Sequence, residues 1–349
     1  MKTFIIFFII LQFSICNRSN TNLNTDFISI NETGRQISLN SSNKKNLIIS
    51  TLIRFKWKKI LPFIKSLIKA NLQNYDIVIF VKEVKASIIH NLKSFGIKVY
   101  EISEKFENII VYNYRWKVYN DFLRNNRGKY KFILSMDLKD SIIQKDIFTL
   151  YRNKEHFLGF SYEHAPLKDG FTGKRILDIF GTELFEKIKN EKIINAGIVW
   201  GTENEIFKFS QILWEKLLIY PQADDQCILN YLYYHEKIFR DPIIFSDKDG
   251  PVITIGLTHR DHINLDLEDN ILNSENQIAS IVHQYDRHKD IQIKIKEKYC
   301  PEFIYANNHF INTIYFFIFL EMVTIILSIK IIKFIFFQKI KNIKMFLDL

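Results

Sequence analysis

The chain has 349 residues, of which 47% are hydrophobic and 25% charged, so it is long enough to bury a sizeable core. Its formal net charge of +10 comes from lysines scattered along the chain, which argues against a nucleic-acid-binding protein. Among its three cysteines there is no CxxC or Cys/His pattern that would indicate a zinc site.

The N-terminal residues 1–16, MKTFIIFFIILQFSIC, have a basic start, an apolar run and small residues before a cleavage point. This pattern is typical of a secretory signal peptide and is too short to span a bilayer comfortably. Residues 17–45 are rich in Ser, Thr and Asn and carry sequons at Asn17, Asn31 and Asn40. They predict a disordered stem in the secretory lumen that can carry N-glycans.

Residues 46–305 contain no Gly/Pro/Ser-rich linker and are predicted to form one domain. Strand-like runs at 46–55, 75–83, 97–102 and 129–136 alternate with helical patterns at 57–72, 84–96 and 113–128. This alternation predicts an α/β fold with a doubly wound, mostly parallel sheet covered on both faces.

The pattern is looser after residue 150. Strands are expected at 156–163, 192–202 and 280–288, and helices at 173–190, 205–220 and 222–237. Either Asp224 or Asp225 is expected to cap the last of these helices.

Acidic residues follow the fourth predicted strand directly, with Asp137 and Asp140 in the first four positions after Met136. Ligands of doubly wound sheets bind beyond the carboxyl ends of the strands. Because charge is costly beside a core, the two carboxylates predict a compensating cation there, although a solvated loop is the plain alternative. The chain has neither GxGxxG nor GxxxxGK[ST], so no dinucleotide fingerprint or P-loop explains the acids.

Four segments in this order, MDLKDSIIQKDIF, INAGIVWGT, DDQCILNYL and VHQYDRH, resemble the motifs of GT-A-type nucleotide-sugar glycosyltransferases. The resemblance covers roughly residues 46–290, most of the body. It implies a GT-A fold, a nucleotide-diphosphate sugar donor, and a divalent cation that acts as a Lewis acid on the departing diphosphate.

The resemblance also implies the metal ligands. The family's Asp-x-Asp signature is one residue wider here, and the register makes Asp140 the direct ligand, with Asp137 reaching the ribose or the metal's water shell. His283 is the implied imidazole ligand, and His288 is its competitor. Carboxylates and one imidazole suit Mn²⁺ or Mg²⁺.

Further site residues are implied by the resemblance or by position. Asn195 and the backbone of Gly197 are expected near the donor sugar, although a strand with a glycine bulge explains them equally. Asp225 and Gln226 are expected to face the sugar or acceptor, and for an inverting reaction one of the acids Asp224 and Asp225 is the first choice of general base. The residues expected to contact the nucleotide or its phosphates are Arg115, Arg287 and, on position alone, Thr51; an ordinary surface arginine is the alternative for Arg115.

Residues 310–337 form a membrane-span candidate with Glu321 inside it, followed by a basic tail at 338–349. The lysines after the span predict a cytoplasmic C-terminus and a lumenal body, in the ER, the Golgi or at the cell surface. An interfacial helix is the alternative. Cys227 and Cys300 are the only pair left for a disulfide, which their spacing leaves open.

These patterns together predict a membrane-anchored, metal-dependent glycosyltransferase that moves a sugar from a nucleotide-diphosphate donor to a glycan, protein or lipid acceptor. A catalytically silent GT-A-fold protein that serves binding at a membrane surface is the alternative from another class, and the wide Asp137–Asp140 spacing favours it slightly. A nucleotidyltransferase is a third reading, but it would bring a Gly-rich basic loop after the first strand, and none is present.

Overall fold

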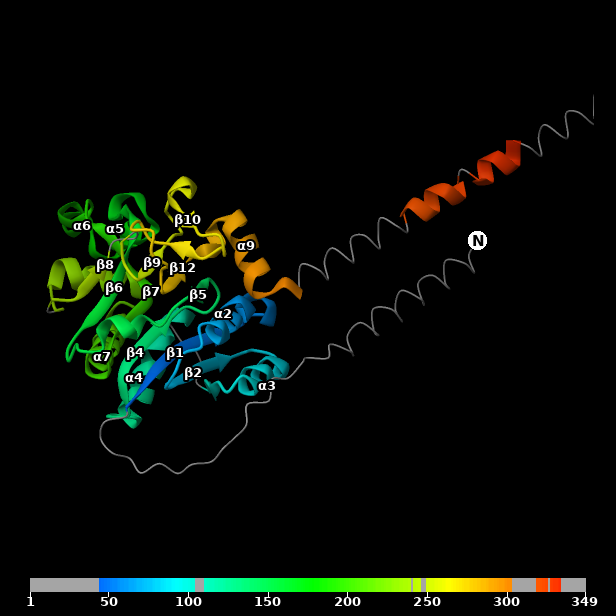
Figure 1. Ribbon diagram of the computed structural model, residues 1–349. Helices are drawn as coiled ribbons and strands as arrows, with labels where there is room; N and C mark the ends of the chain where they lie inside the picture. Colours follow the sequence, from blue (N-terminus) through cyan, green and yellow to red (C-terminus); the bar gives the residue numbers. More distant parts are fainter. Residues whose placement is uncertain are drawn as a thin grey trace, which may run out of the picture. The chain divides into compact units, whose positions relative to one another are not determined.

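The computed structural model describes residues 44–103, 110–239, 241–245, 249–302, 318–325 and 327–333 (Figure 1). Contacts divide the chain into residues 1–43 and 44–349, and every described residue belongs to the second unit. The predicted signal peptide, nearly all of the stem and the basic tail therefore lie outside the described residues, as does part of the predicted membrane span.

The central sheet has seven strands in the order β3-β2-β1-β4-β7-β6-β8. Parallel pairing joins β3 to β2, β2 to β1, β1 to β4 and β6 to β8, whereas β7 runs antiparallel to both β4 and β6. The predicted α/β fold with a mostly parallel sheet is thus confirmed. The strands are β1 (Lys45–Ile53), β2 (Tyr75–Lys82), β3 (Lys98–Glu101), β4 (Tyr130–Met136), β6 (Leu158–Pro166), β7 (Lys192–Thr202) and β8 (Ile243–Phe245).

Helices cover both faces of this sheet. Successive side chains of a strand point to opposite faces, and apolar side chains on both faces are buried by helices. In β1, Leu47 and Ile49 pack into one core with Trp116 and Phe209, while Ile48 packs into a second core with Phe63. The first core contains residues of α4 (Arg115–Asn125), α5 (Phe171–Phe180), α6 (Thr182–Ile188), α7 (Glu203–Ile219) and α8 (Asp225–Tyr231), and the second of α2 (Trp57–Lys69) and α3 (Ala86–Ser94).

A three-stranded sheet of β5 (Ser141–Ile143), β12 (Ile281–His283) and β9 (Val252–Thr254) lies beyond the end of β4. Its core also includes side chains of α9 (Lys289–Tyr299). The sequence pattern did not predict β5, β9 or α9, and it missed the two-stranded ribbon of β10 (Asn264–Leu265) and β11 (Ile271–Leu272). Strands of two or three residues are too short for periodicity to show.

Short helical turns complete the described fold. They are the 3₁₀ turns Val111–Tyr114, Ile147–Tyr151, Leu167–Asp169, Arg260–His262 and Tyr285–Arg287 and the π-helical turn Leu232–Glu236. The helix expected at 173–190 is broken at Gly181, whose φ of +84° ends α5 before α6 begins. Asp224 is the residue that caps α8, because its side chain accepts a hydrogen bond from the Cys227 amide at 2.7 Å.

Two further expectations concern the cysteines and the membrane. Cys227 and Cys300 are both free thiols, so the disulfide that the sequence left open is not formed. Across the described ranges, no helix combines the length and the apolar character that a bilayer crossing requires.

Candidate metal and donor site

Asp137, Asp140 and His283 converge at the carboxyl end of β4, and their ligand atoms all lie within 4.8 Å of one another. The Nε2 atom of His283 is 3.6 Å from Asp137 Oδ2 and 3.6 Å from Asp140 Oδ1. Atoms that bind one small divalent ion at about 2.1 Å lie about 3–4 Å apart, so this donor set fits such an ion. The third residue comes from a point 143 positions later in the chain than Asp140, which only the folded chain brings close.

Backbone pairing fixes these three positions. The Asp137 amide donates to the Gly197 carbonyl at 2.9 Å, which extends the β4–β7 ladder by one residue. β5 begins directly after Asp140 and pairs with β12 so that Ser141 is opposite His283. Asp137 and Asp140 therefore directly flank paired strands, and His283 lies within one.

The charges of the site favour a cation. Burial raises the pKa of Asp137, but the Arg115 guanidinium and His283 outweigh it and hold the value at about 2. Burial raises the pKa of Asp140, and the two carboxylates raise that of His283 although its burial lowers it. A divalent cation would favour the deprotonated carboxylate and the neutral imidazole together.

Gly197 lies against the ligand cluster, where a side chain would not fit. A Cβ atom built at this position would lie 2.7 Å from His283 Nε2 and 2.8 Å from Asp137 Oδ2. The close backbone approach expected at Gly197 is therefore an approach to the candidate metal ligands.

Arg115 lies buried between two carboxylates, those of Asp137 and Asp225, and forms an ion pair with each. Its Nε atom donates to Asp225 Oδ2 at 2.8 Å, and its Nη2 atom donates to the Ala196 carbonyl at 3.1 Å. Burial lowers its pKa, but the two acids raise it above the ordinary value, so the guanidinium stays charged. The solvent-exposed alternative for Arg115 is wrong.

Asp225 is fixed from three sides. Besides Arg115, the indole of Trp116 donates to Asp225 Oδ2 at 2.8 Å, and the Asp225 amide donates to Asn113 Oδ1 at 3.0 Å. The Asn113 amide group in turn donates to the Ala223 carbonyl at 2.7 Å. The start of α8 is thereby attached to α4 and the turn before it.

Asn195 and Gln226 both donate hydrogen bonds to the carboxylate of Glu163. Glu163 is the last residue of the predicted strand 156–163, and the sequence pattern did not predict it as a site residue. Asn195 Nδ2 donates to Glu163 Oε1 at 2.7 Å, and Gln226 Nε2 donates to the same oxygen at 3.1 Å. Glu163 is only 5% exposed and raises the pKa of His283 by its charge, so it belongs to the same site. An acid at a strand end, the signal that identified Asp137, would have identified it.

The remaining predicted residues lie at different distances from this cluster. Arg287 is about half exposed, with Nη2 3.7 Å from Asp140 Oδ2 and Nη1 3.2 Å from Asp286 Oδ1. Thr51 lies at the carboxyl end of β1, where its side chain contacts the phenol of Tyr119. His288 does not join the metal-ligand group, because its Nε2 lies 2.7 Å from the Ile255 carbonyl.

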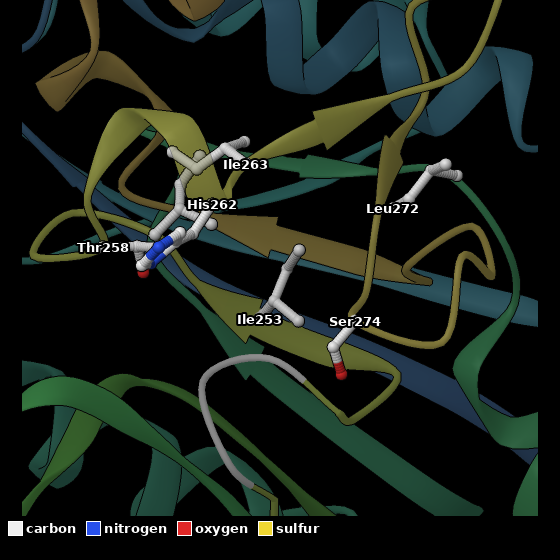
Figure 2. A pocket seen from close by; sticks show the side chains of 7 residues that line it. Ile253, Thr258, His262, Ile263, Leu272 and Ser274 are labelled. Atoms are coloured by element: carbon white, nitrogen blue, oxygen red, sulfur yellow. The ribbon is translucent and has the colours of Figure 1, made fainter.

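A small cavity lies beside β9 and β11 (Figure 2). Its volume is about 30 Å³, room for a water molecule or two, whereas pockets for larger ligands are about 300 Å³ or more. It therefore cannot accept a nucleotide sugar. The residues that line it are Ile253, Ile255, Thr258, His262, Ile263, Leu272 and Ser274.

No protein-family model matches the chain, and no curated protein matches it in sequence. GlyE, a glycosyltransferase of Streptococcus pneumoniae, has a TM-score of 0.43 and 17% identity over 69% of this chain, which spans 55% of GlyE. The galactosyltransferase LgtC, solved with donor and acceptor sugar analogues, has a TM-score of 0.40 and 14% identity, over 68% of this chain and 86% of LgtC. Core-mannan synthase A of Aspergillus fumigatus, in its Mn/GDP form, has a TM-score of 0.36 and 12% identity, over 57% of this chain and 72% of the synthase. These three similar structures are glycosyltransferases, and each TM-score is below 0.5.

Proposed function

We propose that the chain is a metal-dependent glycosyltransferase that transfers a sugar from a nucleotide-diphosphate donor. The observation that supports this most directly is the convergence of Asp137, Asp140 and His283 at the carboxyl end of β4. In an α/β sheet this edge is the place where ligands bind. A bound divalent ion would stabilise the negative charge that develops on the leaving diphosphate.

The protein's own residues would hold this ion and orient the donor. Asp140 and His283 are assigned as its ligands, with Asp137 as a third oxygen donor or a partner of the ion's water. Arg115 is assigned to position Asp137, because its buried guanidinium is paired with the carboxylates of Asp137 and Asp225. Arg287, about half exposed beside Asp140, is the cation placed to contact a phosphate.

The donor sugar is assigned to the hydrogen-bonded cluster of Glu163, Asn195 and Gln226. Asn195 of this cluster also contacts the Gly197 amide. The Gly197 amide donates to Asn195 Oδ1 at 2.8 Å, so the amide side chain proposed to bind the sugar lies two residues before the glycine that packs against the candidate metal ligands. Asp225 is assigned to fix Arg115, because its Oδ2 atom already accepts hydrogen bonds from Arg115 and Trp116. Its role as general base in an inverting reaction stays a prediction.

We also propose the setting in which the reaction occurs. The signal-peptide pattern supports a lumenal body, and the apolar stretch at 310–337 followed by lysines supports a C-terminal membrane anchor. The described parts of that stretch, 318–325 and 327–333, are helical and expose apolar side chains, among them Phe319, Leu320 and Ile332. The acceptor is then a glycan, a protein or a lipid of the secretory pathway.

The test is donor turnover by the full chain, measured as release of nucleoside diphosphate from a panel of nucleotide sugars with and without Mn²⁺. We expect hydrolysis of at least one donor that depends on Mn²⁺. Asp140→Asn and His283→Gln should each lower it by about 10²-fold or more while circular dichroism stays unchanged. His288→Gln is the matched control and should retain turnover, because its ring lies on the Ile255 carbonyl.

Absence of turnover, together with nucleotide binding that Mn²⁺ does not strengthen, would favour the catalytically silent binding protein instead. Full turnover by Asp140→Asn would show that the metal ligand is misassigned.

A further inference from the structure

A second charged feature lies at the other end of β4, where a cleft of about 790 Å³ opens at Tyr130, the first residue of the strand. The strand's seven residues separate this cleft from Asp137 by roughly 20 Å, at about 3.3 Å per residue. The cleft is therefore not part of the metal site. Its charged lining residues are Lys44, Arg127, Lys131, Arg152, Lys154, Glu155 and Glu203.

The cleft is strongly basic, with five lysines and arginines against two glutamates. Glu203 is buried, and its carboxylate accepts hydrogen bonds from the amides of Gly128 at 2.6 Å and Tyr130 at 3.1 Å, so it does not pair with the cations. All five cations are exposed, and none has an ion pair within the described part of the chain. Their positive charges are therefore free to act on a ligand.

The lysine-rich composition does not account for this cleft. Arginine is scarce in the chain, with 11 arginines against 37 lysines, yet two of the arginines line this single hollow. The Arg127 guanidinium lies over the Phe207 ring at 4.3 Å, and Lys131 Nζ donates to the Arg152 carbonyl at 2.9 Å. These contacts hold two of the cationic side chains beside the cleft before any ligand arrives.

We propose that this cleft binds an oligoanion that carries clustered phosphate or sulfate esters. Arginine forks bind such groups bidentately, and several neighbouring cations hold more than one ester at a time. The cleft is large enough for a discrete ligand of several charged groups. Two sources share this chemistry: a polyphosphorylated small molecule and a sulfated oligosaccharide. Either would dock away from the reacting sugar.

The test uses the full chain with EDTA and without donor, so that the metal site takes no part and a failure of the proposed transferase activity leaves the result intact. Isothermal titration calorimetry would measure binding of inorganic tripolyphosphate, of a heparin hexasaccharide and of a neutral hexasaccharide. We expect binding of at least one anionic probe that weakens as salt is added, and no binding of the neutral one.

The double variant Arg152→Gln/Lys154→Gln should lower the affinity for that probe by about tenfold or more. The matched control is Lys93→Gln/Lys145→Gln, which removes the same charge from exposed lysines outside the cleft and should retain the affinity. Binding of tripolyphosphate alone assigns phosphate esters, and binding of the hexasaccharide alone assigns sulfate esters. Binding of neither probe, or equal loss in both double variants, would overturn the proposal.

Discussion

Ser141 lies directly opposite His283 in the antiparallel pairing of β5 with β12. Because Ser141 follows Asp140 in the chain, this single register places the imidazole 3.6 Å from the Asp140 carboxylate. A shift of the register by one residue would turn the His283 side chain to the other face of the small sheet. The metal-ligand geometry thus depends on a strand pair of three residues each.

The Gly197→Ala variant should lose metal affinity, because its Cβ would overlap His283 Nε2 and Asp137 Oδ2. We expect Mn²⁺ binding, followed by electron paramagnetic resonance, to weaken by about tenfold or more, about 1.4 kcal/mol. Gly128→Ala is the control for lost stability, since Gly128 has a φ of +81° and open space around it. If Gly197→Ala binds Mn²⁺ like the parent protein, the three ligands do not hold the ion as assigned.

The Arg115→Met variant should be strongly destabilised. It leaves the buried Asp225 carboxylate without its cation and Asp137 with one partner fewer. Breaking a buried ion pair in this way costs about 3–5 kcal/mol, which urea unfolding would measure. Arg54→Met, which breaks the exposed pair with Glu83, is the control and should be close to neutral. Equal unfolding midpoints for the two variants would contradict the positioning role of Arg115.

Asp76 should contribute stability that depends on pH. Burial raises its pKa, but hydrogen bonds from Lys98 and Lys45 outweigh it, so the folded-state pKa lies below the ordinary value of 3.8. The unfolded chain then binds the proton first, and the contribution is complete above pH 3.8 and is lost as the pH falls through the folded-state pKa.

The measurement compares urea unfolding of Asp76→Asn with that of the parent chain. We expect a difference of about 1 kcal/mol or less near neutral pH that shrinks as the pH falls below the ordinary pKa of an aspartate. Glu183→Gln, which removes an exposed partner of Lys187, is the control and should show little difference at any pH. If the difference in the free energy of unfolding grows as the pH falls, the predicted direction of the Asp76 pKa shift is wrong.

The two cysteines should be inert in the folded chain. Cys227 and Cys300 are both fully buried, and burial raises the pKa of Cys300 to about 12 and that of Cys227 as well. The thiolate is the reactive form, so neither should react with Ellman's reagent until guanidinium is added. In guanidinium, the double variant Cys227→Ser/Cys300→Ser should show two reactive thiols fewer than the parent. Native-state labelling of either residue would contradict this burial.

Sequence reasoning identified the strand-to-acid junction well, because the signal is local: an apolar run in β4 ends and carboxylates begin at once. It preferred His283 to its competitor His288, five residues later in the same segment, only through the family resemblance. The choice depends on the pairing of β12 with β5, where the partner strands are separated by more than 130 positions. Such short strands leave no periodic pattern to read.

Arg115 and Glu163 illustrate the same limit. An arginine at the start of a helix reads equally as a surface residue, and only the folded chain buries it between Asp137 and Asp225. Glu163 ends a predicted strand, but its two amide partners come from β7 and α8, which the chain's order alone does not bring together.

By itself, the sequence determined the α/β class, the mostly parallel sheet and the placing of acids at the end of its fourth strand, because alternating periodicities and strand-end residues are local properties. Tertiary structure alone decided which imidazole joins those acids, which cation positions Asp137, and that a basic cleft opens at the opposite end of the same strand. These outcomes depend on strand register and helix packing between distant segments, and those are settled only when the whole core is buried.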